Sequence, residues 1–572
     1  MTKTIIVAIF LLAAAGGGAA YYYIGHRATG NELAAAVPAD TLFYEHVTDS
    51  ERIVKLQRAN LGLLNGQIQQ YRKLASQLGD VGHLMVGFYD AAAERQSTDQ
   101  LLPGVSETAL YTVGLVPVIR LQLSDPAAFR RFLDEAEKRG GVRGRDGSFQ
   151  GVAYRSYGIN LWNGRPAATS LLLAIRGKFA VATLDVPQFR AESLPLALGL
   201  KAPAQSLARA GLPKRVSTAD GRAPDSVGFL NQAAIVAALV GAPGSLAGSM
   251  LTQLDTKHLL GSVRTPACQR DLQAMAKVWP MTVWDTRLAG GQGSGVVVRT
   301  KAVSEITDAS LTAQLVKLRG HIPPPVMDSS AKPMLVTALG LDVSSVGSVL
   351  GALQRRFVQA AFQCEWLVKA QQQIAKRNPA VASMATSLFG SIKGISLSLF
   401  DLRTAPDGNG GTKLQSADAL LTVSAEQPAR LIGLLKAMQP QLLGNIDIPA
   451  NGTAVPLQLP GVAAGASARI IGNNIALYDG PKAERAAQML TGDDLAADGV
   501  GYYHMDYAKL SEYLVGQWMA RRLGKGVDPA DIERVKDSLQ RMGQTKMRFD
   551  VKQDFGKNGV VMDAKMSVGG TQ

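Results

Sequence analysis

The sequence predicts an α+β fold, with one N-terminal transmembrane helix followed by two tandem duplicated α+β units that have antiparallel or mixed sheets. Three observations predict it: an uncharged apolar run near the N-terminus, a repeated order of elements along the rest of the chain, and a proline-rich segment between the two copies. Strands alternate with helices, but hairpins close each copy, which is typical of sheets covered by helices on one face. The expected domains are a transmembrane anchor over 1–27, a first α+β repeat over 38–319, a proline-rich linker over 320–333 and a second α+β repeat over 334–572.

The expected anchor is the uncharged run over residues 4–24. About 20 apolar residues are enough to cross a hydrocarbon core of about 30 Å. Lys3 precedes the run, and three tyrosines at 21–23 close it, as aromatic rings do at a membrane interface. A cleaved signal peptide is the alternative, but its apolar region usually has only about 7–15 residues. We therefore expect a single-pass inner-membrane protein with a retained signal anchor and its body in the periplasm.

Length and composition describe that body. The chain has 572 residues, which exceeds one ordinary core, and 47% of them are hydrophobic, which indicates a globular protein. The formal net charge is +14, but the basic residues are dispersed and no nucleic-acid-binding signature is present. We therefore expect a basic, soluble surface and no nucleic-acid partner.

The chain has two cysteines, Cys268 and Cys364. A small, even number suits one disulfide in an oxidising compartment of the cell envelope. It equally suits two buried thiols, because the sequence does not give the distance between them. Cys268 and Cys364 are thus a candidate disulfide.

The predicted duplication depends on the order of elements. In each copy a strand leads into a helix that starts at a proline, Pro126 or Pro428, where the first helical turn tolerates this residue. A hairpin with a glycine turn follows, at Gly177 or Gly472. The copies close with similar strands, GVVVRTK over 295–301 and GVVMDAK over 559–565. Residues of roughly 38–303 and 334–570 are therefore expected to be two copies of one unit.

The segment after the anchor, Val37-Pro38-Ala39-Asp40, resembles the start of the outer domain in a bacterial domain-of-unknown-function family. Members of this uncharacterised family are N-terminally membrane-anchored envelope proteins with a Leu-Pro-Ala-Asp-like phrase at that point; here Val37 replaces the usual leucine. The later phrase FQGVAY over 149–154 is also similar. The resemblance implies an envelope protein of unassigned role and brings no catalytic residues.

No motif in the sequence identifies a reaction. The histidines are dispersed, whereas a zinc site needs three or four clustered ligands; they are His26, His46, His83, His258, His321 and His504. The Gly-x-Ser-x-Gly motif of serine hydrolases is absent, and strand residues follow the glycine-rich run at 290–295, where a phosphate loop needs a helix. We therefore expect no catalytic, cofactor-binding or metal-binding residues.

Four aspartates lie at strand ends or helix starts: Asp125, Asp185, Asp479 and Asp506. An aspartate there accepts hydrogen bonds from free backbone N–H groups and complements the helix dipole. We expect these four residues to have that structural role and no catalytic one.

Three functions fit these observations. The first is a non-enzymatic periplasmic protein that acts as an envelope scaffold or protein-interaction module, whose partners are the membrane and other envelope proteins. The alternative is a carrier or sensor of an apolar ligand such as a lipid, bound in a groove of the duplicated domains. The third is an enzyme with a site between the halves, which needs several titratable groups with shifted pKa values in one cleft. We expect the first, with no enzymatic activity and no cofactor.

Overall fold

The computed structural model describes residues 31–569 apart from a set of gaps. The gaps are 49–71, 73–74, 76, 95–102, 161–165, 212–223, 291–294, 329–330, 378–385, 407–411, 445, 458–464, 491–494 and 511–545. The anchor expected at residues 4–24 lies outside the described residues. Within the described part of the chain, no helix is long and apolar enough to cross a membrane.

The predicted fold class is wrong in its architecture. The nineteen described strands are assigned to a single antiparallel sheet, and not to two separate duplicated units behind a transmembrane helix. A repeat in the sequence does not show at which strand a sheet ends. The unpaired N–H and C=O groups of an edge strand can form hydrogen bonds with a further strand. The chain nevertheless divides into two compact units, Met1–Glu305 with Gly569–Gln572 (unit 1) and Ile306–Val568 (unit 2).

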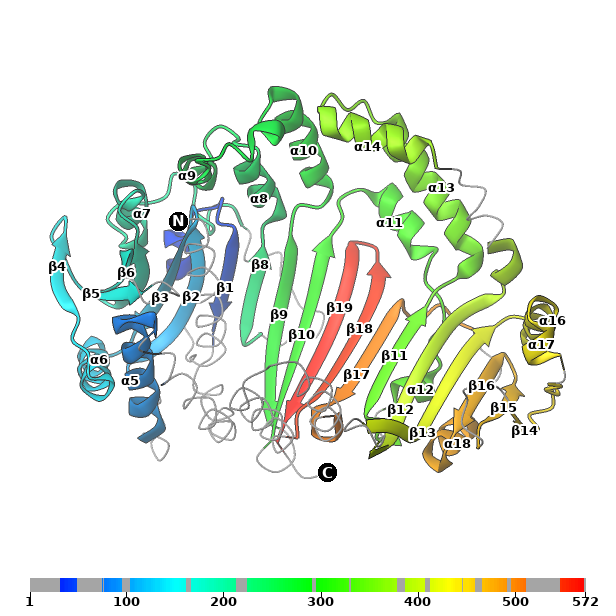
Figure 1. The fold of residues 1–572 in the computed structure, drawn as a ribbon. Helices are drawn as coiled ribbons and strands as arrows, with labels where there is room; N and C mark the ends of the chain where they lie inside the picture. Colours follow the sequence, from blue (N-terminus) through cyan, green and yellow to red (C-terminus); the bar gives the residue numbers. More distant parts are fainter. Residues whose placement is uncertain are drawn as a thin grey trace. The chain divides into compact units, whose positions relative to one another are not determined.

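The described residues of unit 1 form ten strands, each hydrogen-bonded to its neighbour in an antiparallel sense (Figure 1). Their spatial order is β4 (Arg145–Phe149), β5 (Val152–Asn160), β6 (Pro166–Arg176), β7 (Phe179–Asp185), β3 (Val116–Leu123), β2 (Val105–Val113), β1 (Phe43–Val47), β8 (Ser226–Leu230), β9 (Thr282–Gly290) and β10 (Val296–Glu305). Between β8 and β9 the chain forms α8 (Gln232–Leu239), α9 (Leu246–Leu254), the short 3₁₀ helix η4 (Gly261–Val263) and α10 (Pro266–Val278).

Helices cover both faces of the unit 1 strands. On one face, α2 (Asn31–Ala36) and α7 (Arg190–Ala197) place Leu33 and Leu194 in a core with Tyr111. On the other face, α5 (Asp80–Glu94) and α6 (Pro126–Gly140) contribute Leu84 and Phe132 to a second core. Both cores consist mainly of buried apolar side chains, and this burial is the main source of stability for such layers.

In the part of unit 2 that the structure describes, there are nine antiparallel strands. Their spatial order is β14 (Val455–Pro456), β15 (Ser467–Ile471), β16 (Asn474–Asp479), β13 (Thr412–Ala425), β12 (Ile392–Pro406), β11 (Leu335–Gly340), β17 (Gly501–Asp506), β18 (Arg548–Gly556) and β19 (Gly559–Val568). This order matches that of unit 1 except that β4 has no counterpart; β11 takes the place of β1, β12 that of β2 and β17 that of β8.

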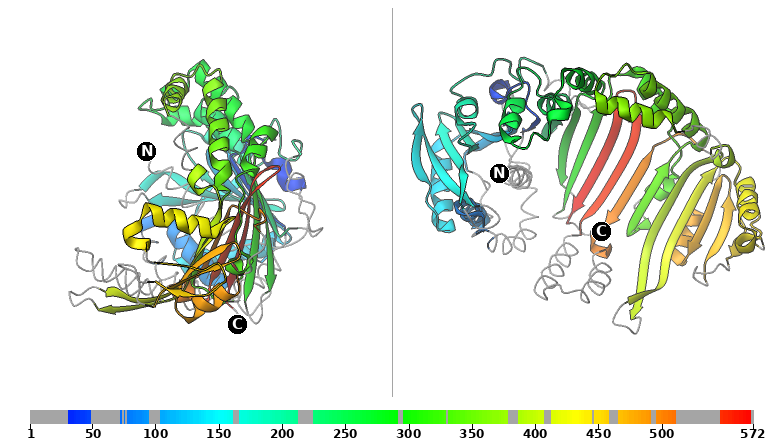
Figure 2. Two further views of the ribbon diagram at one scale, coloured as in Figure 1. Left: turned by 90° about the vertical axis from the view of Figure 1, so that its right-hand side faces the viewer. Right: turned by 45° about the horizontal axis from the view of Figure 1, so that its top comes forward.

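The described helices of unit 2 include α11 (Ala309–Val316), α12 (Pro324–Met327), α13 (Val343–Gln359), α14 (Glu365–Ala375), α16 (Pro428–Met438), α17 (Pro440–Leu443) and α18 (Pro481–Gln488). Two of them, α12 and α18, pack on one face of the strands, where Val326 meets Val336 and Ala483 meets Leu420. On the opposite face α16 lies beside the outer strands (Figure 2). Its Leu431 packs with Ile475. The face that α16 covers only in part carries the candidate site.

Candidate interaction surface and the polar network behind it

One face of unit 2 exposes apolar side chains along adjacent strands. Leu339 of β11 lies opposite Ile395 of β12 in the antiparallel register, and Thr337 lies opposite Leu397. Cross-strand partners share a face of a sheet. The exposed fractions are 45% for Leu339, 46% for Ile395 and 41% for Leu397. Together with the half-buried neighbours Leu335, Leu399, Tyr503 and Met505, these three residues are called the apolar face.

The alternation of β12 is the reverse of the usual one. An antiparallel strand with one solvated face normally points apolar residues inward and polar residues outward. In β12, Ser396 and Ser398 are only 3% and 4% exposed, whereas Ile395 and Leu397 point to solvent. The strand therefore buries hydroxyl groups while it exposes aliphatic side chains.

The apolar face continues into a region that a helix already covers. Val423 of β13 is the cross-strand partner of Ile395, so the two side chains lie on the same face. Val423 packs against a buried cluster that includes Leu431 of α16. Over β13 and β16 this face thus has a helical cover, and over β11 and β12 its aliphatic residues are exposed.

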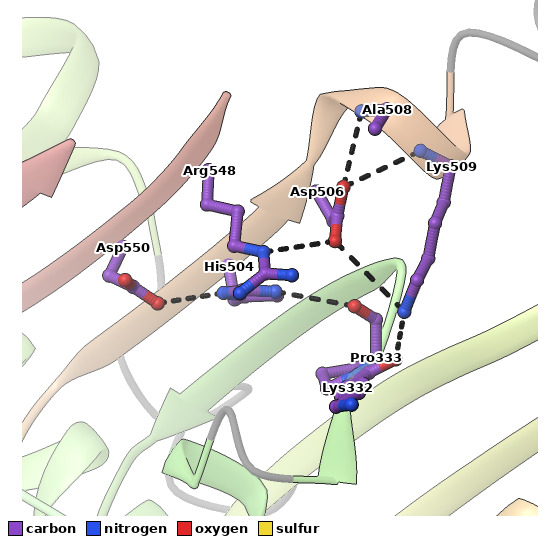
Figure 3. Close-up of polar contacts among 8 residues, drawn as sticks. All are labelled: Lys332, Pro333, His504, Asp506, Ala508, Lys509, Arg548 and Asp550. Carbon is purple, nitrogen blue, oxygen red and sulfur yellow. Dashed lines mark hydrogen bonds and ion pairs between the residues drawn. The ribbon is translucent and has the colours of Figure 1, made fainter. Parts of the chain in front are cut away.

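Behind the apolar face, β17 carries a buried polar network. Side chains alternate along a strand, so His504 points to the opposite face from Tyr503 and Met505. His504 is 2% exposed. Its Nδ1 is 2.7 Å from Oδ1 of Asp550 on β18, and its Nε2 is 3.3 Å from the carbonyl oxygen of Pro333 (Figure 3). Both ring nitrogens are therefore engaged with oxygen atoms of neighbouring segments.

The charge of Asp550 depends on this network. Burial alone would raise the pKa of Asp550, but the hydrogen bond and the charge of His504 outweigh burial and lower it. The hydroxyl of Tyr502 also donates to Oδ1 of Asp550, at 3.0 Å. Burial and the neighbouring carboxylate raise the pKa of Tyr502. Asp550 is thus a stably ionised acceptor for two side chains of β17.

Asp506 joins the end of β17 to two cations. Its carboxylate accepts hydrogen bonds from the backbone N–H of Ala508, at 3.1 Å, and from Nε of Arg548, at 3.1 Å. Nζ of Lys509 lies 4.0 Å from Asp506 and donates to the carbonyl oxygen of Lys332, at 2.5 Å (Figure 3). Burial, together with nearby cations, lowers the pKa of Lys509. The network ties β17 and β18 to the segment before β11, and so fixes strands that carry the apolar face on their other side.

The polar groups of this network are bonded to other groups of the protein. His504 is buried, and both of its ring nitrogens lie within hydrogen-bond distance of oxygen atoms of the protein. Among the described residues, no group of three or more His, Cys, Asp or Glu side chains could hold a metal ion.

The other residues singled out in the sequence lie apart from this surface. His46 in unit 1 is buried, with Nε2 2.8 Å from Oε2 of Glu107. The predicted capping role is confirmed for Asp125, which accepts from the N–H of Ala128, and for Asp506. It is wrong for Asp185, whose carboxylate instead lies 3.5 Å from Nε of Arg190.

The capping role is also wrong for Asp479. The backbone N–H groups of Lys482 and Ala483, in the first turn of α18, donate to the carboxylate of Asp418, at 3.1 and 2.7 Å. Gly480, with a φ of 93°, separates Asp479 from the helix. The cap therefore comes from the neighbouring strand β13, far away in the sequence.

Cys268 belongs to α10, and Cys364 immediately precedes α14. Both are buried and disulfide-bonded, and neither is free. The two cysteines are therefore disulfide-bonded and are not two buried free thiols.

No protein-family model, no curated protein and no solved structure matches this chain. The resemblance to an uncharacterised envelope family stays a prediction from short phrases of sequence.

Proposed function

We propose that this chain is a non-enzymatic protein-interaction module or scaffold of the bacterial cell envelope, and that the apolar face of unit 2 is its docking surface. The single observation that carries the proposal is the reversed alternation of β12, which buries Ser396 and Ser398 and exposes Ile395 and Leu397. Covering apolar surface contributes about 25 cal/mol per Å². A contiguous exposed apolar patch on a soluble body is typical of an interaction site.

The proposed location is the periplasmic side of the inner membrane. Disulfides form and persist in oxidising compartments, and both cysteines of this chain are bonded. The uncharged run at residues 4–24 agrees with a membrane-proximal location, although it lies outside the described residues.

A protein partner is favoured over an enclosed apolar ligand. On the other side of the unit 2 strands is a pocket with a cavity volume of only about 10 Å³. Its lining includes Val326, Phe400, Leu420 and Leu490. Typical pockets for small ligands have about 300–1,000 Å³ and bury most of the ligand. The apolar face, in contrast, is open and suits a partner that brings its own surface.

A matched pair of substitutions tests the proposal in cells that produce the protein. Leu397→Glu places a charge on the apolar face, and Leu259→Glu makes the same change at a site in unit 1 with 78% exposure. After cross-linking in intact cells and purification, we expect the protein complexes of the full chain to be lost with Leu397→Glu and kept with Leu259→Glu.

Two outcomes would contradict the proposal. Equal recovery of complexes from both variants would show that the apolar face docks no protein. Loss of a co-purifying lipid from Leu397→Glu, with unchanged protein complexes, would support the carrier alternative instead. Thermal unfolding of both variants checks that each remains folded.

A further inference from the structure

Two Asn-Gly dipeptides of the chain lie among the described residues, Asn451-Gly452 and Asn558-Gly559. Glycine after asparagine leaves the backbone nitrogen free to approach the side-chain amide, because glycine has no side chain of its own and little conformational restriction. The two dipeptides carry the same reacting groups. A difference in reactivity between them must therefore come from the surrounding structure or from the flanking residues.

Asn451 lies in an exposed turn between α17 and β14. Its side chain is exposed, and so is Thr453. Oδ1 of Asn451 accepts a hydrogen bond from the backbone N–H of Thr453, at 3.0 Å. A donor at a carbonyl oxygen stabilises the negative charge that develops there when a nucleophile attacks the carbon. The amide carbon of Asn451 is thus activated toward attack, and water has access to it.

Asn558 has an exposed side chain as well, but its backbone is held on both sides. Gly559 is the first residue of β19, is buried, and lies opposite Gly556 in the ladder of β18 and β19. The carbonyl oxygen of Asn558 accepts a hydrogen bond from the backbone N–H of Ile306, at 2.8 Å. Attack by the nitrogen of Gly559 on the side-chain amide therefore requires local opening of this hairpin.

We propose that Asn451 is a site of spontaneous deamidation and that the fold protects Asn558 from the same reaction. The backbone nitrogen of Gly452 attacks Cγ of Asn451 and loses its proton. The bond from Cγ to the side-chain nitrogen breaks, ammonia leaves, and a cyclic succinimide remains. Water then adds to one of the two ring carbonyl groups and opens the ring to aspartate or isoaspartate. This inference is independent of the proposed docking function.

The product changes the turn that leads into β14, the outermost described strand at this end of unit 2. A Cβ atom built on Gly452 would lie 3.8 Å from the carbonyl oxygen of Ile470, so the turn runs beside β15. Val455 of β14 pairs with Ala468 of β15, one of only two paired positions between these strands. Aspartate adds a negative charge, and isoaspartate also adds one carbon atom to the backbone. We expect the pairing of β14 with β15 to loosen.

The test uses the purified full chain, kept folded at mildly alkaline pH, where a backbone nitrogen loses its proton more readily. Peptide mapping by mass spectrometry at intervals measures asparagine, aspartate and isoaspartate at each site. We expect conversion at Asn451 to be about tenfold faster than at Asn558, which reacts only from the open hairpin. In a parallel sample unfolded in urea, the two sites should convert at similar rates.

A matched pair of variants isolates the site. Asn451→Gln should stop conversion at position 451, because glutamine must form a larger ring, and Asn558→Gln should leave conversion at Asn451 unchanged. Hydrogen exchange of the β14 and β15 peptides should become faster in the aged unchanged chain. The aged Asn451→Gln chain should keep its original exchange rates.

Each part of the proposal has an outcome that overturns it. Equal conversion of Asn451 and Asn558 in the folded chain would overturn the site. A rate ratio that is the same in urea as in the folded chain would assign the difference to flanking sequence, and so overturn protection by the fold. Unchanged hydrogen exchange after conversion of Asn451 would overturn the loosening of β14.

Discussion

Units 1 and 2 follow the same strand order but present different chemistry on corresponding faces. In unit 1, α6 covers the face that α16 covers in unit 2, since each helix follows the corresponding strand. Beyond these helices, unit 1 pairs hydroxyl groups across its strands. Oγ1 of Thr286 is 3.0 Å from Oγ1 of Thr300, and Oγ1 of Thr282 is 2.9 Å from Oγ of Ser304.

The central position of that face differs most. In β1 of unit 1 it holds Glu45, which accepts a hydrogen bond from Ser226, at 2.9 Å. In β11 of unit 2 the corresponding position holds Thr337, between Leu335 and Leu339. One strand order thus supports a face of mixed polarity in unit 1 and an apolar, exposed face in unit 2, so function is defined by the side chains on the face rather than by the fold.

The largest expected effect separates buried from exposed leucines in unit 2. Leu420→Ala removes a side chain that is 1% exposed, so we expect a loss of about 2–5 kcal/mol in unfolding free energy. Leu397→Ala on the apolar face should change the unfolding free energy by less than about 1 kcal/mol. The Leu397 side chain is exposed, so folding without a partner removes little of its apolar area from water. Denaturant unfolding of both variants measures this. Equal losses would mean that Leu397 belongs to the core.

The next effect concerns the network behind the apolar face. Asp550→Asn keeps the shape of the side chain but removes the charge that faces His504, so we expect a loss of about 1–3 kcal/mol in stability. Asp563→Asn on the neighbouring strand β19 is the control, since this residue is exposed, and it should stay within about 0.5 kcal/mol. If both variants unfold alike, the network contributes nothing to the stability of unit 2.

The two units should respond to acid in opposite directions. Burial raises the pKa of Glu45, so its contribution is present below the unfolded value of about 4.3 and is lost as pH rises through the folded pKa. The pKa of Asp550 is lowered in the folded state. Its contribution is present above the unfolded value of about 3.9 and is lost as pH falls through the folded pKa.

Between pH 7 and pH 3, Glu45 should therefore favour unit 1 while Asp550 weakens unit 2. Hydrogen exchange of peptides from each unit, corrected for intrinsic rates, measures this difference. Glu45→Gln and Asp550→Asn should each flatten the response of their own unit. A response that neither variant alters would assign the pH dependence to other groups.

The smallest effect concerns the hydroxyl groups that β12 buries. Among the described residues, Oγ of Ser396 has no hydrogen-bond partner. Removing a buried polar group that lacks a partner is neutral or stabilising, so Ser396→Ala should raise unfolding free energy by up to about 1 kcal/mol. Thermal unfolding checks this, and a clear loss of stability would mean that Ser396 has a partner in solution.

Local features of the fold could be predicted from the sequence. Pro126 and Pro428 each start a helix as expected. Gly177 and Gly472 occupy hairpin turns with φ angles of 55° and 52°, which favour glycine. These predictions succeed because they depend on the conformational preference of one residue.

Features that depend on distant pairing could not be predicted. The continuity of the sheet depends on which strands meet, and the cap of α18 comes from Asp418 on another strand. The apolar face was missed for a related reason. The stretch ISLSL over 395–399 shows clear alternation, but alternation alone does not tell which set of side chains points to the core, and apolar residues are normally assigned there.

The most direct test of the docking surface is a matched pair of threonine substitutions on the corresponding faces of the two units. Thr337→Glu places in unit 2 the charge that Glu45 supplies in unit 1, and Thr300→Glu adds the same charge to the face of unit 1. The measurement is the amount of cross-linked protein complex recovered with the full chain from intact cells. We expect Thr337→Glu to abolish recovery and Thr300→Glu to leave it unchanged; full recovery with Thr337→Glu would contradict docking on the apolar face.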